Sequence, residues 1–241
     1  YAFEHRGVKK CFSTHRGIRQ GCKAAPCLWS AFAAILLLQA TEVINWQFVI
    51  NFVTTYADDF CVHQQFTSAL EFEALIQALG KLLDLIESAG LELNVVKTTA
   101  TLRMKGTLLN QIQRKHLHRT KQGVFLKVPR HDGTFTHIKL VKSFRYLGVM
   151  LSYYNFERET MERRIKHSAQ TAQQLHRWIY STKNIPVRSK VRIWYQCVFS
   201  CLRYGILFTG FNDNIILMFY RFCKRQLRRM FKEPVFITRE T

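Results

Sequence analysis

Apolar residues recur with helical spacing in several parts of the chain and cluster as strands between them. The clearest helical stripe falls in residues 70–89, and Gly90 follows it at a position typical of a helix C-terminal cap. Residues 28–43 are also rich in strong helix formers. We therefore predict helices over 28–43 and 70–89. The apolar members of the second stripe are Leu75, Ile76, Leu79, Leu82, Leu83 and Ile86.

Short apolar runs of β-branched and aromatic residues predict strands around these helices. Residues 48–56 indicate a buried strand, and residues 60–66 indicate a second strand that returns beside it. Because Ala57, Asp58 and Asp59 interrupt the two runs, we expect a hairpin with two carboxylates at its tip. Residues 91–96 predict a further strand, in which Asn94 fixes the backbone geometry.

The second half of the chain changes from mixed structure to helices. A short basic helix is predicted over residues 109–119, and strands over 123–128 and 135–141 flank a turn at 130–133. Residues 144–151 predict one more strand. Helices are expected over 157–180, 187–204 and 213–232. The pattern thus predicts an α+β chain with a β-containing domain over 1–155 and a helical domain over 156–241.

The most apolar run, residues 31–38, is too short to span a bilayer, and polar residues close it from Gln39 on. We interpret it as part of a buried helix and expect no membrane partner. The chain begins with Tyr1 rather than an initiator Met, and its first ten residues contain no continuous apolar stretch. We therefore expect an internal fragment of a longer protein.

Charge is distributed unevenly along the chain. The formal net charge is +20, from 36 Lys and Arg against 16 Asp and Glu. Residues 1–96 hold 7 basic and 9 acidic residues, whereas residues 97–241 hold 29 basic and 7 acidic ones. An acidic chemical centre beside a basic groove has this composition, and a nucleic acid is the expected partner. Seven cysteines, an odd number in a long chain, favour a reducing compartment.

The adjacent carboxylates of Asp58 and Asp59 are the first candidate for chemistry. Two neighbouring carboxylates between apolar strands repel each other and lose hydration, and a bound divalent cation relieves both costs. Mg²⁺ prefers oxygen ligands, typically one or two carboxylates with substrate phosphates and water. Aspartate is also a common turn residue, so this pair alone leaves a purely structural role open.

Four motifs in a fixed order extend this argument. Together they resemble reverse transcriptases, especially those of non-long-terminal-repeat (non-LTR) retrotransposons, and the resemblance runs from about residue 13 to the C-terminus. It implies a partial polymerase palm, an antiparallel sheet with helices, followed by an α-helical thumb. The motifs are Arg16-Gly17-Ile18-Arg19-Gln20-Gly21-Cys22, Tyr56-Ala57-Asp58-Asp59, Gly90-Leu91-Glu92-Leu93-Asn94-Val95-Val96-Lys97-Thr98 and Phe144-Arg145-Tyr146-Leu147-Gly148-Val149.

The resemblance assigns roles to matching residues around the carboxylates. Asp58 corresponds to a palm ligand of catalytic Mg²⁺, and Asp59 to its neighbour nearer the primer end. Tyr56 and Ala57 then lie close to the primer terminus. The template and incoming nucleotide would meet a preceding loop, although this motif taken alone would favour an ordinary surface turn. Its matching members are Arg16, Gln20 and Gly21.

The later motifs receive roles in the same way. Lys97 corresponds to a lysine that protonates or stabilises the departing pyrophosphate, or it is a surface lysine that ends a strand. Residues Tyr146, Leu147 and Gly148 resemble the primer grip, while Tyr146 could equally belong to a core strand. The helical tail resembles a thumb that packs along the template–primer duplex. Its basic residues include Arg163, Arg164, Lys166, Lys224, Arg225, Arg228 and Arg229.

The family resemblance also shows what this stretch of sequence lacks. Reverse transcriptases use a further aspartate upstream of the template loop, and only Glu4 is acidic before Arg16. We therefore expect an upstream polymerase segment to complete a two-metal Mg²⁺ site, and the isolated chain to polymerise poorly or not at all. The implied partners are an RNA template, a DNA primer and dNTPs, and the implied location is nuclear. The alternative is a non-catalytic nucleic-acid-binding protein or a remnant of a reverse transcriptase.

Overall fold

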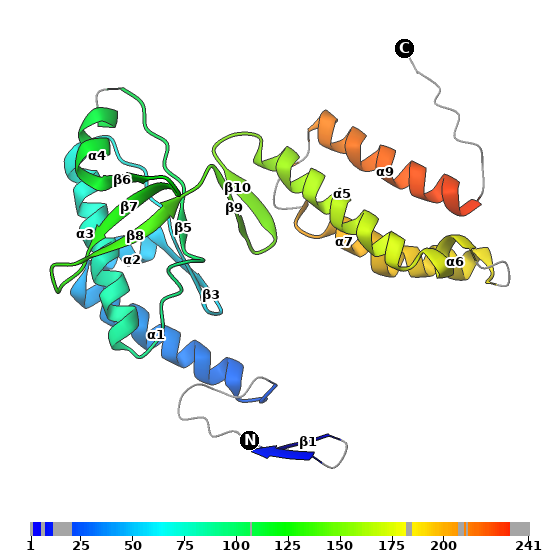
Figure 1. The fold of residues 1–241 in the computed structure, drawn as a ribbon, viewed down its shortest axis with the longest axis horizontal. Coiled ribbons are helices and arrows are strands. Elements are labelled where there is room, and N and C mark those ends of the chain that lie inside the picture. Colours follow the sequence, from blue (N-terminus) through cyan, green and yellow to red (C-terminus); the bar gives the residue numbers. More distant parts are fainter. Residues whose placement is uncertain are drawn as a thin grey trace. The chain divides into compact units, whose positions relative to one another are not determined.

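The computed structural model describes residues 2–5, 8–11, 21–106, 108–181, 185–206, 210 and 212–231. The chain divides into two compact units, one of residues 1–98 with 104–139 and one of residues 99–103 with 140–241. Both units contain helices and small antiparallel sheets, which confirms the predicted α+β class (Figure 1). The hairpin that precedes the helical tail groups with that tail, and the expected palm–thumb boundary at residue 155 stays a prediction.

Four helices form the frame of the first unit. Helices α1 (Ala25–Val43) and α3 (Ala69–Ser88) confirm the predictions over 28–43 and 70–89, and α4 (Leu108–His116) is the expected short basic helix. The fourth, α2 (Trp46–Phe52), lies in the chain between α1 and the first strand of the hairpin whose tip holds Asp58 and Asp59. Gly90, with a φ of +85°, ends the α3 segment as predicted.

A capping box fixes the start of α3. The Ser68 hydroxyl accepts from the Glu71 N–H at 3.2 Å, while the Glu71 carboxylate accepts from the Thr67 N–H at 2.7 Å. This backbone hydrogen bond from Thr67 is the main cause that lowers the pKa of Glu71. One of the otherwise unpaired N–H groups of the helix, that of Glu71, is therefore satisfied, and Glu71 also holds Thr67, which precedes the cap.

Four strand pairs described in the first unit are antiparallel. Strands β1 (Ala2–His5) and β2 (Val8–Cys11) form one hairpin, and β3 (Val53–Tyr56) and β4 (Asp59–Val62) form another. Strands β6 (Leu117–Thr120), β7 (Gly123–Pro129) and β8 (Phe135–Leu140) pair in that order. The last two confirm the predicted hairpin over 123–141, with Gly133 in the turn at a φ of +81°.

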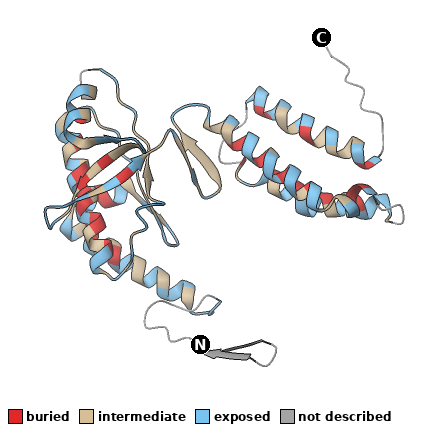
Figure 2. Ribbon diagram, in the orientation of Figure 1, coloured by how far each residue is buried: buried red, intermediate tan, exposed pale blue. Residues whose placement is uncertain are grey.

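Helix α3 is packed on two sides. Its apolar stripe meets α1 and α2 in one core cluster (Figure 2). Its Gly80 lies against β7 so closely that an added Cβ would collide with the Pro129 carbonyl oxygen. At the end of β7, Arg130 donates to Asp84 of α3 at 2.7 Å and also pairs with Glu87. The cluster consists of Leu36, Ala40, Phe48, Val49, Ala78, Leu82 and Ile86.

The predicted single strand over 48–56 is wrong in its first half. Residues 46–52 form α2, and only β3 is extended. The Asn45 side chain accepts from the Gln47 N–H at 2.7 Å and so caps a helix that the β-branched composition did not favour. Burial of Phe48 and Val49 in the α1–α3 core then outweighs their strand propensity.

The expectation of a buried helix over residues 31–38 is only partly right. The helix exists, but Leu36 is the one buried residue of that run, and Ile35 and Leu38 are 57% and 58% exposed. Among the described residues, α1 is also the one helix that is long and apolar enough to cross a membrane, judged by length and composition alone. The core helix of a soluble protein can satisfy the same criteria.

The second unit begins with short strands. The first of these is β5 (Thr99–Ala100). The N–H of Val141, which precedes the next hairpin of this unit, donates to the Ala100 carbonyl oxygen at 2.9 Å. The predicted strand over 144–151 is instead a tight hairpin of β9 (Ser143–Tyr146) and β10 (Val149–Ser152). The chain reverses because Leu147 and Gly148 are both left-handed, with φ of +47° and +83°.

Helices follow this hairpin, as predicted for the tail, but with more breaks. Helix α5 (Phe156–Gln174) leads into the π-helical segment η1 (Arg177–Ser181). Helix α6 (Val187–Ile193), the π-helical segment η2 (Trp194–Phe199) and α7 (Ser200–Arg203) together occupy the expected second helix. Helix α9 (Asp213–Phe231) occupies the third. Their shared core includes Met161, Ile179, Trp194, Val198, Leu202, Ile215 and Phe222.

The β9–β10 hairpin is fastened to α5 by two buried side chains. The Arg164 guanidinium donates to the Gly148 carbonyl and lies over the Tyr204 ring at 4.5 Å. The Thr160 hydroxyl accepts from the Met150 N–H at 3.0 Å. A Cβ on Gly148 would lie 2.5 Å from the Arg164 guanidinium and 2.7 Å from the Tyr204 ring. Glycine is thus required here for close packing as well as for its left-handed backbone.

Because of this packing, we expect two glycine substitutions with the same backbone strain to lower the local free energy of unfolding by different amounts. Gly133→Ala at φ +81° should cost about 1 kcal/mol from strain alone. Gly148→Ala should cost roughly 2–3 kcal/mol, because Arg164 and Tyr204 must also move. Amide hydrogen exchange read separately over residues 123–140 and 143–152 measures both local free energies. Equal losses of protection would contradict the close packing around Gly148.

Candidate functional site

The two carboxylates lie at the tip of the β3–β4 hairpin, as predicted. Tyr56 and Asp59 form the last cross-strand pair, and Ala57 and Asp58 make the turn between them. Since paired residues share a face of the ladder, the side chains of Tyr56 and Asp59 lie on the same face. Both aspartates are exposed, and Tyr56 is 61% exposed. The tip therefore offers two carboxylates and an aromatic ring to a ligand in solvent.

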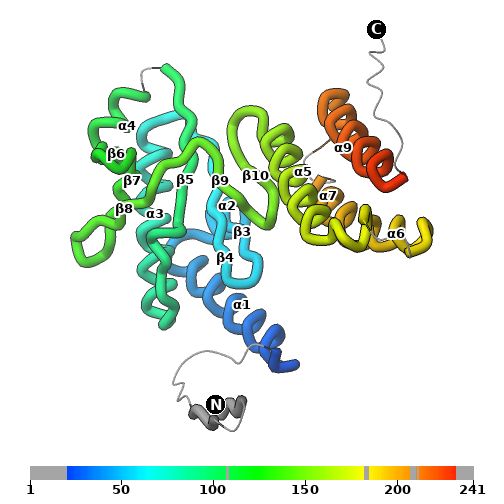
Figure 3. The backbone as a smooth tube through the Cα atoms, turned by 45° about the vertical axis from the view of Figure 1, so that its right-hand side comes forward, coloured from blue at the N-terminus to red at the C-terminus, as the bar shows by residue number. Residues whose placement is uncertain are grey.

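Helix α1 holds this turn in place. The Trp29 indole N–H donates to the Ala57 carbonyl oxygen at 2.7 Å, so α1 and the tip lie together (Figure 3). Ala57 has a left-handed φ of +51°, a conformation that costs a non-glycine residue about 1–2 kcal/mol. Such strain persists only where the surrounding structure enforces it. Trp29 thus positions the turn, and the sequence patterns did not predict this contact. The one feature that could have indicated it is a polar indole N–H near the start of an otherwise apolar helix.

The donor set at the tip is suited to a hard divalent cation. Two adjacent carboxylates supply the oxygen ligands that Mg²⁺ prefers, and substrate phosphates and water commonly complete its shell. Within the described ranges, no group of three or more His, Cys, Asp or Glu residues is placed to hold a metal ion. Burial raises the pKa of the nearby Cys61 thiol, which keeps this soft ligand protonated.

The segment that carries Lys97 is a loop, so the predicted strand over 91–96 is wrong. The Asn94 side-chain and backbone oxygens both accept from the Lys97 N–H at 3.1 Å, and the Asn94 carbonyl also accepts from Thr98. Asn94 thus fixes the backbone, as predicted, and turns the chain before a ladder can form. Lys97 itself is exposed.

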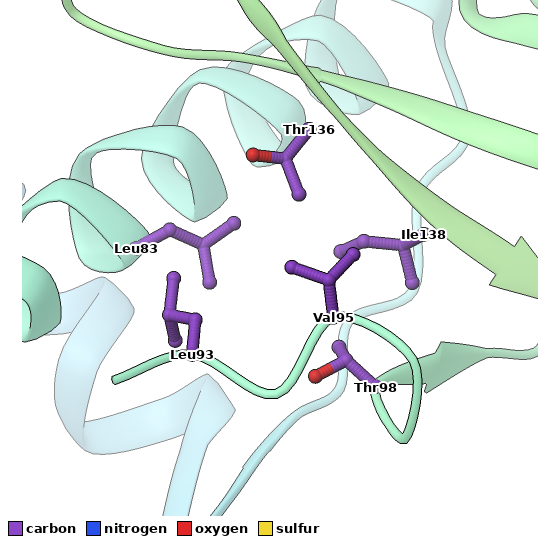
Figure 4. Close-up of a pocket in the computed structure, with 6 residues that line it drawn as sticks. All are labelled: Leu83, Leu93, Val95, Thr98, Thr136 and Ile138. Carbon is purple, nitrogen blue, oxygen red and sulfur yellow. The ribbon is translucent and has the colours of Figure 1, made fainter. Parts of the chain in front are cut away.

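This loop forms one wall of a small apolar hollow that α3 and β8 also line (Figure 4). Leu93 and Val95 point into the hollow, whereas Val96 between Val95 and Lys97 is 92% exposed. Lys97 therefore stands on a turn whose base is anchored by neighbouring side chains. The lining residues are Leu83, Leu93, Val95, Thr98, Thr136 and Ile138.

The other predicted site residues lie in different parts of the structure. Arg16 and Gln20 fall outside the described residues, and Gly21 is an exposed turn residue with a φ of +82°. The turn of Tyr146, Leu147 and Gly148 belongs to the second unit, whereas the carboxylates and Lys97 belong to the first. The roles assigned to all these residues stay predictions.

Among the basic residues of the tail, Arg164 does not have the expected position. Its side chain is buried against Gly148 and Tyr204, and burial lowers its pKa, so it acts as a structural anchor rather than a phosphate contact. Arg163 and Lys166 on the same helix are exposed, as are Arg225 and Arg229 on α9. Of these four exposed cations, the Arg229 guanidinium also lies over the Tyr180 ring at 4.8 Å.

A comparison with protein families shows to which family the chain belongs. The family model described as reverse transcriptase (RNA-dependent DNA polymerase) matches residues 3–151, well over half of the chain. The chain belongs to the reverse transcriptase family. No curated protein and no solved structure matches it. The matched region of this reverse transcriptase chain includes the carboxylate tip, the Lys97 loop and the turn at Leu147 and Gly148.

We expect the Trp29 hydrogen bond to order the carboxylate tip. Trp29→Phe keeps a ring near Phe32, 5.5 Å away in the native chain, but removes the N–H that Ala57 accepts. Amides of residues 53–62 should then exchange faster, by an amount equivalent to about 1 kcal/mol of local stability. Trp46→Phe, at a 58% exposed position of α2, is the matched control. Equal protection in both variants would show that the bond does not hold the turn.

Proposed function

We propose that this chain is the C-terminal palm and thumb portion of a reverse transcriptase from a non-LTR retrotransposon, which extends a DNA primer along an RNA template. The observation that carries the proposal is the exposed Asp58-Asp59 pair at the tip of an antiparallel hairpin, inside the region that matches the family. The order of the four motifs supports the assignment to non-LTR elements.

In this proposal the hairpin tip binds the reacting groups. Asp58 and Asp59 hold Mg²⁺, and two such ions supply activation of the 3′-hydroxyl and charge stabilisation of the leaving pyrophosphate. Tyr56 lies on the same ladder face as Asp59 and contacts the primer end. Ala57 has a side chain small enough to let the primer strand approach closely, and Trp29 keeps the turn in position.

The remaining residues position the substrates. Lys97, raised on its anchored loop, donates a proton or positive charge toward the pyrophosphate. Arg16, Gln20 and Gly21 contact the template and the incoming dNTP, while the turn at Tyr146, Leu147 and Gly148 holds the primer. Exposed cations of α5 and α9 contact phosphates of the RNA–DNA hybrid without reading its sequence.

An upstream segment of the same polyprotein completes the site in this proposal, because the tip itself supplies two carboxylates and the family uses a third. Primer extension at chromosomal DNA places the whole protein in the nucleus. Both points rest on the family resemblance, and the two experiments below test the first of them.

We expect the isolated 241-residue chain to bind an RNA–DNA hybrid but not to extend it. Binding should weaken steeply with salt, since residues 97–241 carry 29 basic residues against 7 acidic ones. Labelled primer–template with Mg²⁺ and dNTPs measures extension, and fluorescence anisotropy of the same hybrid measures binding. Robust Mg²⁺-dependent extension would overturn the requirement for an upstream aspartate.

In a chain extended upstream to include the third carboxylate, Asp58→Ala should abolish synthesis. We expect a loss of at least about a hundredfold in rate, because a metal ligand is removed, with hybrid binding largely unchanged. Asp132→Ala removes a carboxylate from another hairpin turn, where Asp132 accepts from the Thr134 N–H at 2.9 Å, and should leave the rate within about twofold. If both variants were equally active, Asp58 would not be catalytic.

A second candidate is a non-catalytic reverse-transcriptase-like protein, or a remnant, kept for nucleic-acid binding. The strongly basic second half of the chain favours this candidate independently of the carboxylates. It predicts that the extended chain binds the hybrid with the same salt dependence but shows no synthesis, with or without Asp58. The primer-extension assay on the extended wild-type chain therefore separates the two functions.

A further inference from the structure

One face of the β6–β7–β8 sheet carries a row of aromatic and basic side chains. The cross-strand register sets His118 opposite Phe125, Phe125 opposite Lys139, and Lys127 opposite His137. Residues paired across a ladder share a face, as do residues two apart along a strand. This face, called the outer sheet face below, therefore contains His118, Phe125, Lys127, Phe135, His137 and Lys139.

The opposite face of the same sheet is covered. Leu126, Val128 and Ile138 are at most 6% exposed, and β7 packs against α3 and α4. In contrast, Phe135 on the outer sheet face is 55% exposed, and His118, His137 and Lys139 are also exposed. The sheet is thus apolar and buried on one side, and aromatic and basic on the other.

The outer sheet face is suited to an anionic partner with flat apolar groups. Strands β6, β7 and β8 contain no Asp or Glu, and the rings of His118 and His137 lie 5.3 Å apart across the sheet. The nearest turn carboxylate, Asp132, is occupied by the N–H and the hydroxyl of Thr134. Lysine supplies charge to phosphates, while Phe and His rings supply stacking surfaces for bases.

We propose that the outer sheet face binds a single strand of RNA. Bases stack on Phe125, Phe135 and the histidine pair, and Lys127 and Lys139 contact the phosphates between them. A duplex keeps its bases stacked inside, so an aromatic row on a sheet favours an unpaired strand. RNA is the committed occupant because the family is described as RNA-dependent, so the proposal rests on family membership but not on catalysis at Asp58.

The first experiment locates the contact directly on the full 241-residue chain. A single-stranded RNA oligonucleotide containing 4-thiouridine is photo-crosslinked in EDTA, and the modified peptides are identified by mass spectrometry. We expect crosslinks within residues 117–139, at aromatic positions such as Phe135. Crosslinks confined to the helical tail would overturn the proposal, and EDTA makes the outcome independent of metal-dependent chemistry at Asp58.

The second experiment measures affinity with matched controls. Phe135→Ala and Lys139→Glu should each weaken single-stranded RNA binding by at least about fivefold, as expected for one lost stacking or phosphate contact. Leu70→Ala removes a 78% exposed apolar side chain from α3, and Lys105→Glu reverses an exposed charge in a loop of the same unit. These controls should stay within about twofold of the wild type.

The same affinity series distinguishes the occupant. Anisotropy is measured with single-stranded RNA, single-stranded DNA of the same sequence and duplex RNA. Effects of Phe135→Ala that are restricted to single-stranded RNA support the proposal. Equal effects on duplex RNA, a preference for single-stranded DNA, or losses in the control variants as large as those at Phe135 and Lys139 would each overturn it. Unchanged far-ultraviolet circular dichroism confirms that the exposed-site variants fold.

Discussion

The first unit depends on the packing of α3 against two layers at once. On one side its leucines and isoleucines close a core with α1 and α2, and each such side chain contributes roughly 1.5–3 kcal/mol when buried. On the other side Gly80 brings the helix against Pro129, and Arg130 joins β7 to Asp84. Because α3 has both contacts, its position sets that of every neighbouring element in the unit.

The packing of α3 also fixes the position of the candidate site. Phe60 and Val62 of β4 pack on the α1–α3 core, which fixes the base of the hairpin, while Trp29 fixes its tip. Leu93 of the following loop packs on the same core, so the segment bearing Lys97 is fixed through its apolar neighbours. The chemistry-bearing side chains are themselves exposed, and their placement comes from residues that touch no substrate.

Sequence patterns predicted the parts of this structure that local chemistry decides. The α3 stripe, the cap at Gly90, the carboxylate hairpin and the turn before Phe135 all carry their signals within a few residues. Two of the wrong predictions involve distant contacts, whereas the strand expected over 91–96 is broken by local hydrogen bonds of Asn94. Burial on α1 and α3 made residues 46–52 helical, and the fit of Gly148 under Arg164 turned one expected strand into a hairpin. Trp29 was missed because its partner, Ala57, lies 28 positions away.

The position of α1 in the chain has a consequence for synthesis of the protein. Leu36 and Ala40 are covered by α3, whose Ala78, Leu82 and Ile86 leave the ribosome some forty residues later. On its other side, Leu28, Ile35 and Leu38 stay more than half exposed in the finished fold. An apolar helix that emerges early and waits for its cover is a binding surface for chaperones that hold extended or nascent hydrophobic segments. The interval between the synthesis of α1 and that of α3 is thus the time during which Leu36 and Ala40 lack their cover.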